Sequence, residues 1–272
     1  MFIKKRLPVW FFTNEKIGTF LPLIEKQRNI ARVFAIGGGG DLAFSLLSSF
    51  TPEAVIVCDQ QELAIATIDL KKEMIRVLQR EEFIDLCVGR RIFDLKDLCG
   101  RVKTQLASES RKTLSTLENL ETSDFLAALK KSRLWHRGSL WQISHAEEYL
   151  PYLASESTYA QLQDNLGVIR LVRSDFTQTL LSFPSGTFDL IYVSNIFDGK
   201  DYCPNPALYL KTIRERLDSE GVLLAVTQHY VKTMRLLTEA GFYVGGSVRN
   251  RFNILSSLLG HFSYSFLLLR RR

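Results

Sequence analysis

The sequence predicts an α/β protein with a doubly wound, seven-stranded sheet, and three observations lead to this expectation. The apolar run 33–36 is broken by four glycines and followed by an amphipathic helical pattern that starts at Asp41. Apolar runs of strand length then alternate with helical patterns along much of the chain, which is typical of a parallel sheet covered by helices. The last two apolar runs, 241–244 and 262–269, are expected to close the sheet as an antiparallel pair.

Length and composition favour one large domain. The 272 residues, 46% of them hydrophobic, can form a full core. We expect residues 1–30 to form an N-terminal packing arm or lid, and residues 31–272 to form an α/β domain with a helical insertion at about 83–154. No window approaches the roughly 20 apolar residues of a membrane-spanning helix, and the N-terminus lacks the features of a signal peptide.

The cysteines and the net charge limit which metals and partners are expected. The four cysteines lie far apart without metal-ligand spacing, so we expect reduced thiols, no metal site and a cytoplasmic location. The net charge of +6 permits an acidic partner without requiring one, and no nucleic acid is expected. In the N-terminal segment, Trp10, Phe11, Phe12 and Phe20 are too apolar to remain in water. The sequence leaves two roles open for this segment, a packing arm and a substrate lid.

The first β-α-β unit carries the main motif. The strand 33–36, the glycines 37–40, a helix over 41–50 and a strand over 54–58 lead to Asp59. Glycines let a ligand lie against the main chain, and an acid at the end of the second strand can accept both hydroxyl hydrogens of a ribose. An ordinary tight strand–helix turn is the alternative interpretation. The candidate cofactor-binding residues of this unit are Gly37, Gly38, Gly39, Asp41, Asp59 and Gln60.

The spacing of the glycines indicates which class of ligand the turn is suited to bind. The dinucleotide fingerprint G-x-G-x-x-G is not met, because position 42 is leucine. Gly-x-Gly-x-Asp is closer to the first motif of class I S-adenosylmethionine (AdoMet) enzymes, which have a Rossmann-like fold.

The next helix, expected over 61–80, adds further residues that resemble a family of AdoMet-dependent enzymes. The stretches FAIGGGGD, VIVCDQQELAIATIDLKKEMI and REEFIDL resemble the family of AdoMet:diacylglycerol 3-amino-3-carboxypropyltransferases of betaine-lipid synthesis and their uncharacterised relatives. The matching pieces are residues 37–41, 59–61 and 70–71, although Gln60 and Gln61 stand where asparagine and proline are usual. The resemblance covers about residues 30–230 and implies AdoMet as co-substrate. It does not reach the lipid substrate, so the acceptor is expected to be an unidentified small molecule or lipid.

The insertion at about 83–154 separates this unit from the rest of the sheet. Within residues 100–140, eight basic and four acidic residues leave a local excess of +4. This excess allows contact with an anionic surface, and a solvated helical face is the alternative. Insertions on α/β cores usually carry substrate choice. Surface, packing or ligand roles stay open for Trp135, His136, Trp141 and His145.

The core is expected to resume with a strand at 168–172. Ser174, Asp175 and Phe176 follow at its end, where AdoMet folds commonly hold an acid that binds the adenine amino group beside an apolar residue. Asp175 is also suited to cap a helix over 177–181, and both roles can coexist. We include all three residues among the candidate cofactor-binding residues.

The next strand, 187–193, opens the FDLI-x-x-S-N pattern, which recurs in AdoMet-dependent enzymes and in the family named above. The following loop lies at the carboxyl end of that strand, the edge where open α/β sheets bind ligands. Ser194 and Asn195 are therefore candidate cofactor-binding residues, and the candidate catalytic residues are Asn195, Asp198 and Tyr202. A helix over 207–217 that ends near residues 219–221, a strand over 221–228 and a helix over 230–240 complete the pattern.

The motifs indicate the co-substrate AdoMet, but they do not indicate which of its groups is transferred. All three carbons bonded to the AdoMet sulfur are electrophilic, so the bound geometry selects the group that is transferred. The resemblance points to transfer of the 3-amino-3-carboxypropyl group with release of methylthioadenosine. Methyl transfer to a small molecule and a non-catalytic binding role are the alternatives. If the acceptor needs a base, the candidates are Asp198, Asp201, Tyr202, His136 and His145.

Overall fold

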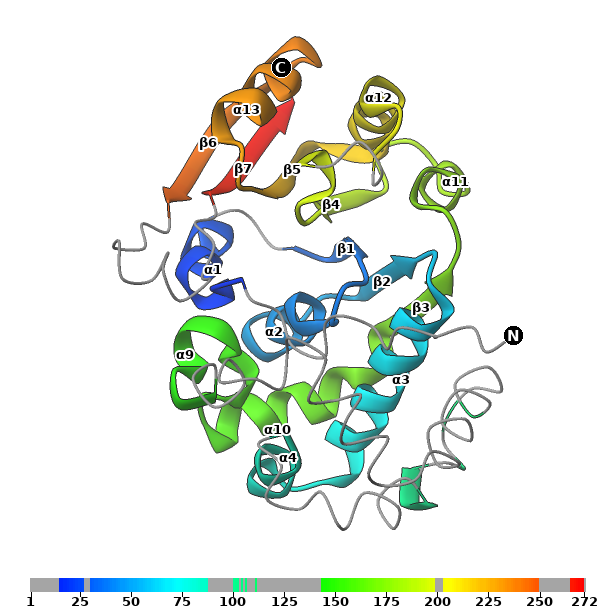
Figure 1. The fold of residues 1–272 in the computed structure, drawn as a ribbon, viewed down its shortest axis with the longest axis vertical. Helices are drawn as coiled ribbons and strands as arrows, with labels where there is room; N and C mark the ends of the chain where they lie inside the picture. The colour runs from blue at the N-terminus through cyan, green and yellow to red at the C-terminus, as the bar shows by residue number, and fades with distance from the viewer. Residues whose placement is uncertain are drawn as a thin grey trace, which may run out of the picture.

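The computed structural model describes residues 15–26, 30–87, 100–102, 104, 106, 111, 143–198, 203–249 and 265–271 (Figure 1). The strands in this part of the chain form one seven-stranded sheet in the order β3-β2-β1-β4-β5-β7-β6. Strands β3, β2, β1, β4 and β5 are parallel, and β7 runs antiparallel to both β5 and β6. The predicted doubly wound sheet with its antiparallel closing pair is confirmed. The strands are β1 Arg32–Ile36, β2 Ala54–Asp59, β3 Ile169–Arg173, β4 Phe188–Tyr192, β5 Leu217–Thr227, β6 Phe242–Arg249 and β7 Ser265–Arg271.

Helices cover both faces of the sheet. Helices α1, α2, α3 and α10 contribute to one buried apolar cluster, and α11, α12 and α13 contribute to a second cluster on the opposite face. The described helices are α1 Ile17–Glu25, α2 Asp41–Ser49, α3 Glu62–Val77, α4 Arg80–Cys87, α9 Ala146–Tyr149, α10 Glu156–Asn165, α11 Phe176–Leu181, α12 Pro206–Arg216 and α13 Tyr230–Glu239, with 3₁₀ turns η2 Pro151–Leu153, η3 Leu166–Val168 and η4 Ile196–Asp198.

The continuous apolar runs in the strands follow from this double covering. In β1, Val33 and Ala35 belong to the first cluster, whereas Phe34 between them belongs to the second. In β5, Leu224 and Leu223 divide in the same way. Successive side chains point to opposite faces of a strand, so a sheet buried on both sides needs apolar residues at every position.

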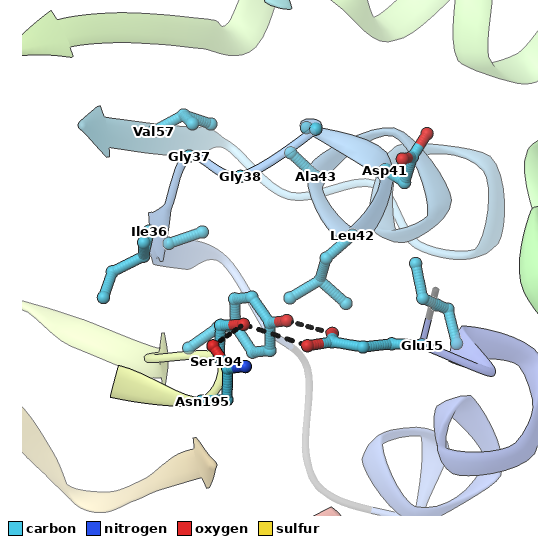
Figure 2. Close-up of a pocket in the computed structure, with 15 residues that line it drawn as sticks. Glu15, Ile36, Gly37, Gly38, Asp41, Leu42, Ala43, Val57, Ser194 and Asn195 are labelled. Atoms are coloured by element: carbon cyan, nitrogen blue, oxygen red, sulfur yellow. Dashed lines mark hydrogen bonds between the residues drawn. The ribbon is translucent and has the colours of Figure 1, made fainter. Parts of the chain in front are cut away.

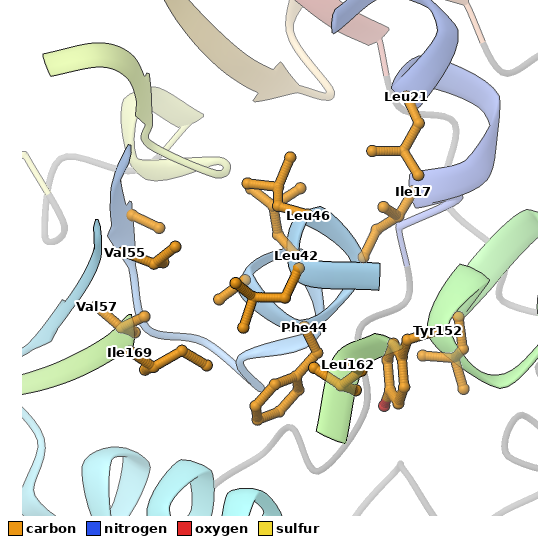
Figure 3. Close-up of a cluster of buried hydrophobic side chains, with 14 of the residues drawn as sticks. Ile17, Leu21, Leu42, Phe44, Leu46, Val55, Val57, Tyr152, Leu162 and Ile169 are labelled. Atoms are coloured by element: carbon orange, nitrogen blue, oxygen red, sulfur yellow. The ribbon is translucent and has the colours of Figure 1, made fainter. Parts of the chain in front are cut away.

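Helix α2 is enclosed on all sides, which makes it a rigid base for the turn before it. Its residues from Asp41 to Ser48 are all buried. Figure 3 shows its apolar side chains between strand residues such as Val55 and the α1 residues Ile17 and Leu21. The Ser45 hydroxyl donates to the Asp41 carbonyl oxygen at 2.7 Å, which satisfies a polar group in this apolar setting.

Several predicted boundaries differ from the structure, and one of them is the end of the helix expected over 61–80. Helix α3 ends before Leu78, whose extended backbone breaks it, and α4 starts at Arg80. The Gln163 side-chain amide on α10 donates to the carbonyl oxygens of Ile75 and Leu78 at 2.8 and 3.0 Å. A partner distant in sequence therefore satisfies the last carbonyls of α3.

Another such boundary lies before β5. The predicted helix through Leu217 ends one residue earlier, and β5 begins at Leu217 instead of at the predicted residue 221. The pairing of β5 with β4 shifts register between Phe188 and Leu190, as at a β-bulge. A Cβ at Gly221 would lie 2.8 Å from the Phe188 carbonyl oxygen, so glycine permits this close approach.

Only parts of the predicted insertion are described. Helix α9 and the turn η2 at its end pack against α1 and α2. Most of its basic residues, together with Trp135, His136 and Trp141, lie outside the described residues, so their roles stay predictions. Within the described chain, no helix has the length and apolar character needed to cross a membrane.

Candidate ligand-binding site

The glycine turn between β1 and α2 forms the floor of the site. The Gly37 N–H donates to the Cys58 carbonyl oxygen at 2.8 Å, and the Gly40 N–H donates to the Gly37 carbonyl oxygen at 2.8 Å. Gly38 has φ +48° and Gly40 has φ +77°, which is the left-handed region that favours glycine. The turn is thus tied to β2 on one side and leads into the buried α2 on the other.

Asp59, at the end of β2, lies directly against this turn. A Cβ at Gly37 would come within 2.9 Å of the Asp59 Cβ, so only glycine lets the two strands approach in this way. The Asp59 Oδ1 accepts the Gln61 N–H at 2.8 Å. Burial raises the pKa of the Asp59 carboxyl above its ordinary value of 3.8, and the backbone N–H groups of Gln61, Gly38 and Gln60 oppose part of that rise.

A buried ion pair between α3 and the start of α2 stabilises the glycine turn. The Lys71 ammonium on α3 donates to the Gly39 carbonyl oxygen and to the Asp41 Oδ1, both at 2.7 Å, and both side chains are fully buried. The Tyr152 hydroxyl donates to the same Asp41 Oδ1 at 2.7 Å. The carboxylate predicted to bind the ligand is therefore bonded to two protein groups. It lies at the pocket, and its contact with a ligand stays a prediction.

The turn opens into a pocket of about 610 Å³, counting its open mouth. Figure 2 shows Gly37 and Gly38 on one side of it, Ser194 and Asn195 on another, and Glu15 approaching from the N-terminal segment. The pocket thus joins the ends of β1 and β4, which are neighbours in the sheet. Of the sequence-predicted residues, it is lined by Gly37, Gly38, Gly39, Asp41, Ser194 and Asn195.

Ser194 is held in an unusual backbone conformation. Its φ of +46° makes it the one residue other than glycine with a positive φ among those described. Its carbonyl oxygen accepts the Val226 N–H of β5 at 3.0 Å, which helps to fix the turn after β4. Such outliers are held by their surroundings and are frequent at functional sites, which agrees with its place in the pocket.

Glu15 is a pocket residue that the sequence analysis missed. It is 5% exposed, and its Oε1 accepts the Ser194 hydroxyl at 2.9 Å while its Oε2 accepts the Tyr192 hydroxyl. Burial raises the pKa of the Glu15 carboxyl above its ordinary value of 4.5, although these two hydrogen bonds lower it. No motif surrounds Glu15 in the sequence, so nothing in the local pattern distinguishes it from an ordinary surface glutamate.

Around β3, the structure brings together a second group of predicted residues outside the pocket lining. The Asp175 Oδ1 accepts the Gln178 N–H at 3.0 Å, so the predicted helix cap is confirmed. Its Oδ2 accepts the Gln60 side-chain amide at 2.6 Å. The Ser174 N–H donates to the Asp59 carbonyl oxygen at 3.1 Å, and the Phe176 ring stacks on Tyr209 with centroids 5.5 Å apart. The predicted adenine contacts of these residues stay predictions.

The other candidate catalytic residues are placed apart from the pocket lining or lie outside the described residues. The Asp198 carboxylate accepts the Thr227 hydroxyl at 2.5 Å and the Gln228 N–H at 2.8 Å, so it ties the loop after β4 to the end of β5. His145 precedes α9 and does not line the pocket. Tyr202 and Asp201 lie outside the described residues.

The thiols and possible metal ligands add no further site in the described chain. Cys58 and Cys203 are free and buried, and burial raises the pKa of the Cys203 thiol to about 12. Among the described residues, no group of three or more His, Cys, Asp or Glu side chains is placed to hold a metal ion.

Comparison with known proteins shows a likeness to solved structures. No protein-family model matches the chain, and no curated protein matches it. A SAM-dependent methyltransferase from Aquifex aeolicus is 11% identical, with 98% of this chain and 93% of that chain covered and a TM-score of 0.43. Spermidine synthase from Thermotoga maritima is 14% identical, with 98% of this chain and 62% of that chain covered and a TM-score of 0.43. TrmN from Thermus thermophilus is 12% identical, with 99% of this chain and 53% of that chain covered and a TM-score of 0.47. Likeness at this level carries no argument about activity.

Proposed function

We propose that the chain is an AdoMet-dependent transferase that binds AdoMet between the glycine turn and the carboxyl end of β4. The pocket that joins these two elements carries the proposal, because main-chain atoms of the glycine turn and polar side chains at the end of β4 line it together. A Cβ at Gly38 would meet nothing within 4 Å, so the turn faces open space in which a ligand can lie against the main chain. Asp59, at the end of the adjacent strand β2, lies beside the turn.

In this proposal, different residues of the described chain bind different parts of AdoMet. The main chain at Gly37 and Gly38 lies against the adenosyl part, and Asp59 accepts hydroxyl hydrogens of the ribose. Asn195 lies at the amino-acid end, while Asp175 and Phe176 serve the adenine. AdoMet supplies a sulfonium with electrophilic carbons and a neutral thioether leaving group. The protein therefore has to orient the acceptor more than to assist departure of the leaving group.

Within this reaction class, we propose transfer of the 3-amino-3-carboxypropyl group. This part rests on the resemblance of residues 37–41, 59–61 and 70–71 to the aminocarboxypropyltransferase family. Lys71, one of the matching residues, bonds the Gly39 carbonyl oxygen and so has a structural reason to accompany the glycine turn. Methyl transfer is the alternative outcome, since the same cofactor residues serve either reaction.

The acceptor in this proposal is a small molecule or a lipid with a nucleophilic lone pair. In this proposal the basic insertion contacts an anionic surface, because eight basic and four acidic residues within 100–140 leave a local excess of positive charge. Co-sedimentation with vesicles tests this contact. Binding that increases with anionic lipid and decreases with salt supports it, and equal binding to neutral vesicles contradicts it.

The products distinguish the reactions. The protein is incubated with AdoMet and cell extract, and the adenosyl products are identified by mass spectrometry. Methylthioadenosine supports aminocarboxypropyl transfer, and S-adenosylhomocysteine indicates methyl transfer. Asp59→Asn should weaken AdoMet binding and product formation together. Glu53→Gln, an exposed residue just before the opposite end of β2, is the matched control and should change neither.

A non-catalytic binding role is tested in the same experiment. It predicts AdoMet binding without either product, or no binding at all. Calorimetry on folded protein that shows no heat with AdoMet, S-adenosylhomocysteine or methylthioadenosine would remove the transferase proposal itself.

A further inference from the structure

A buried carboxylate lies at the β4 side of the pocket, away from Asp59. Glu15 comes from the segment before β1 and reaches the pocket beside the ends of β1 and β4. Strand β1 separates β2 from β4 in the sheet, so Asp59 and Glu15 flank the glycine turn from its two sides. Figure 2 shows the Glu15 carboxylate meeting the hydroxyl groups at the end of β4.

The two hydroxyl donors orient this carboxylate. One oxygen accepts from Ser194 and the other from Tyr192, so both oxygens of the carboxylate are held in place. Ser194 itself is fixed by its backbone bond to β5. The carboxylate is thus held on rigid elements, as expected of a group that positions a ligand.

The segment that carries Glu15 is anchored as well. The Lys16 ammonium donates to the Glu148 Oε2 on α9 at 2.5 Å and lies 5.3 Å from the centroid of the Tyr149 ring. Gly18 packs so closely on α9 that a Cβ there would lie 1.8 Å from the Glu147 carbonyl oxygen. The end of the insertion therefore fixes the position of a pocket residue.

We propose that Glu15 binds the α-ammonium group of the methionyl arm of AdoMet, an inference that rests on the proposed function. A carboxylate at this depth favours a cation and disfavours an anion. The ammonium group offers up to three N–H donors in hydrogen-bonding directions, whereas the sulfonium offers none. With the ribose at Asp59, the methionyl arm extends across β1 towards β4, where Glu15 lies. Glu15 and Asn195 both line this pocket, so in the proposed pose both lie at the amino-acid end of the ligand.

The experiment compares three ligands on two proteins by calorimetry. S-adenosylhomocysteine has the ammonium but no sulfonium, AdoMet has both, and methylthioadenosine has neither. Glu15→Gln should weaken binding of S-adenosylhomocysteine and of AdoMet by about 10- to 100-fold, as expected for loss of a hydrogen bond between charged groups. Methylthioadenosine should bind within about twofold of the wild type. Glu25→Gln, an exposed residue at the end of α1, is the matched control and should change none of the three.

The outcomes separate the inference from the function on which it rests. Equal weakening of all three ligands by Glu15→Gln, or no weakening for S-adenosylhomocysteine, overturns the ammonium site while leaving AdoMet binding established. Weakening confined to AdoMet would assign Glu15 to the sulfonium and also overturns it. If the wild type binds none of the three, the proposed function fails and the inference falls with it.

A second measurement needs no variant, in case Glu15→Gln does not fold. An S-adenosylhomocysteine analogue with hydrogen in place of the amino group is titrated into the wild type. We expect about 10- to 100-fold weaker binding than for S-adenosylhomocysteine. Affinity equal to that of S-adenosylhomocysteine would overturn the proposal.

Discussion

At the residue scale, Lys71 shows how a charge inside the protein can shape a loop. Its ammonium is fully buried and bonds both the Asp41 carboxylate and the Gly39 carbonyl oxygen. A buried pair of this kind contributes little net stability over an apolar pair, but breaking it leaves one charge uncompensated. Its role is therefore to fix the conformation of the glycine turn.

Lys71→Met should destabilise the protein by about 3–5 kcal/mol, because the buried Asp41 carboxylate then loses its ammonium partner. Urea unfolding measures the change. Adding Asp41→Asn should recover part of the loss. The control is Arg235→Ala, which breaks an exposed ion pair with Glu239 on α13 and should leave the unfolding midpoint unchanged. A Lys71→Met protein as stable as the wild type would contradict the buried pair.

Glu15 should make stability depend on pH. Its pKa is raised by burial, so the folded protein binds this proton more tightly than the unfolded chain does. The contribution of Glu15 to stability is therefore full below about pH 4.5, the ordinary pKa, and is lost as the pH rises through the raised pKa of the folded protein. Glu15→Gln removes this loss, so its stability relative to the wild type should increase with pH.

The measurement for this prediction is urea unfolding of both proteins between about pH 4 and pH 8. Glu25→Gln, at an exposed position, provides the control and should follow the wild type at every pH. A difference between Glu15→Gln and the wild type that stays constant over this range contradicts the assignment.

Residues with a local signature could be predicted from the sequence, and residues with a distant partner could not. Gly38, Ser194 and Asn195 belong to short motifs at strand ends, and all three line the pocket. Lys71 had a usable signal, because it shares a helix face with the buried Ile68 and Ile75. Glu15 had none, since its partners lie in β4 and just after it, far along the chain.

At the element scale, the contact of α1 with α9 depends on one glycine. Gly18→Ala would place a methyl group 1.8 Å from the Glu147 carbonyl oxygen, so α1 must move away from α9. We expect a loss of about 1–3 kcal/mol, partly offset by the better helix propensity of alanine. The displacement should also weaken ligand binding, because Glu15 lies just before α1.

Thermal or urea unfolding, together with calorimetry of ligand binding, measures the Gly18→Ala effects. Gly167→Ala is the matched control. No atom lies within 4 Å of a Cβ built at Gly167, so that variant should lose neither stability nor affinity. Unchanged stability of Gly18→Ala would show that α1 and α9 are not in close contact.

Element types were easier to predict than element ends. The alternation of strand and helix patterns predicted the order of strands and helices along the chain, because each apolar run reflects burial on both faces of the sheet. The end of α3 was missed because Gln163, from a helix much later in the chain, bonds its last carbonyls. The start of β5 was missed because the bulge opposite Phe188 places polar residues inside a strand.

At the scale of the whole molecule, the sheet separates two apolar clusters. Leu162 of α10 lies in one cluster and Leu210 of α12 in the other, and both are almost fully buried. Replacing either leucine with alanine should cost about 2–5 kcal/mol. Because the sheet lies between them, the two losses should add to within about 0.5 kcal/mol in the double variant, measured by urea unfolding.

The matched comparison for this prediction is a pair in contact. The rings of Phe44 and Tyr152 are 5.7 Å apart in the first cluster. Phe44→Leu and Tyr152→Leu, which each remove one ring of this contact, should therefore show non-additive losses. Strong coupling between Leu162 and Leu210 would contradict the separation of the clusters.

The pocket also has a consequence for the order of folding. Its walls come from residues 177 positions apart, since Tyr192 bonds Glu15. Closing so long a loop costs entropy before the contact is gained, so these walls should meet late, after helices and neighbouring strands have formed. During refolding, recovery of ligand binding should lag behind the far-ultraviolet circular dichroism signal, and simultaneous recovery would contradict this order.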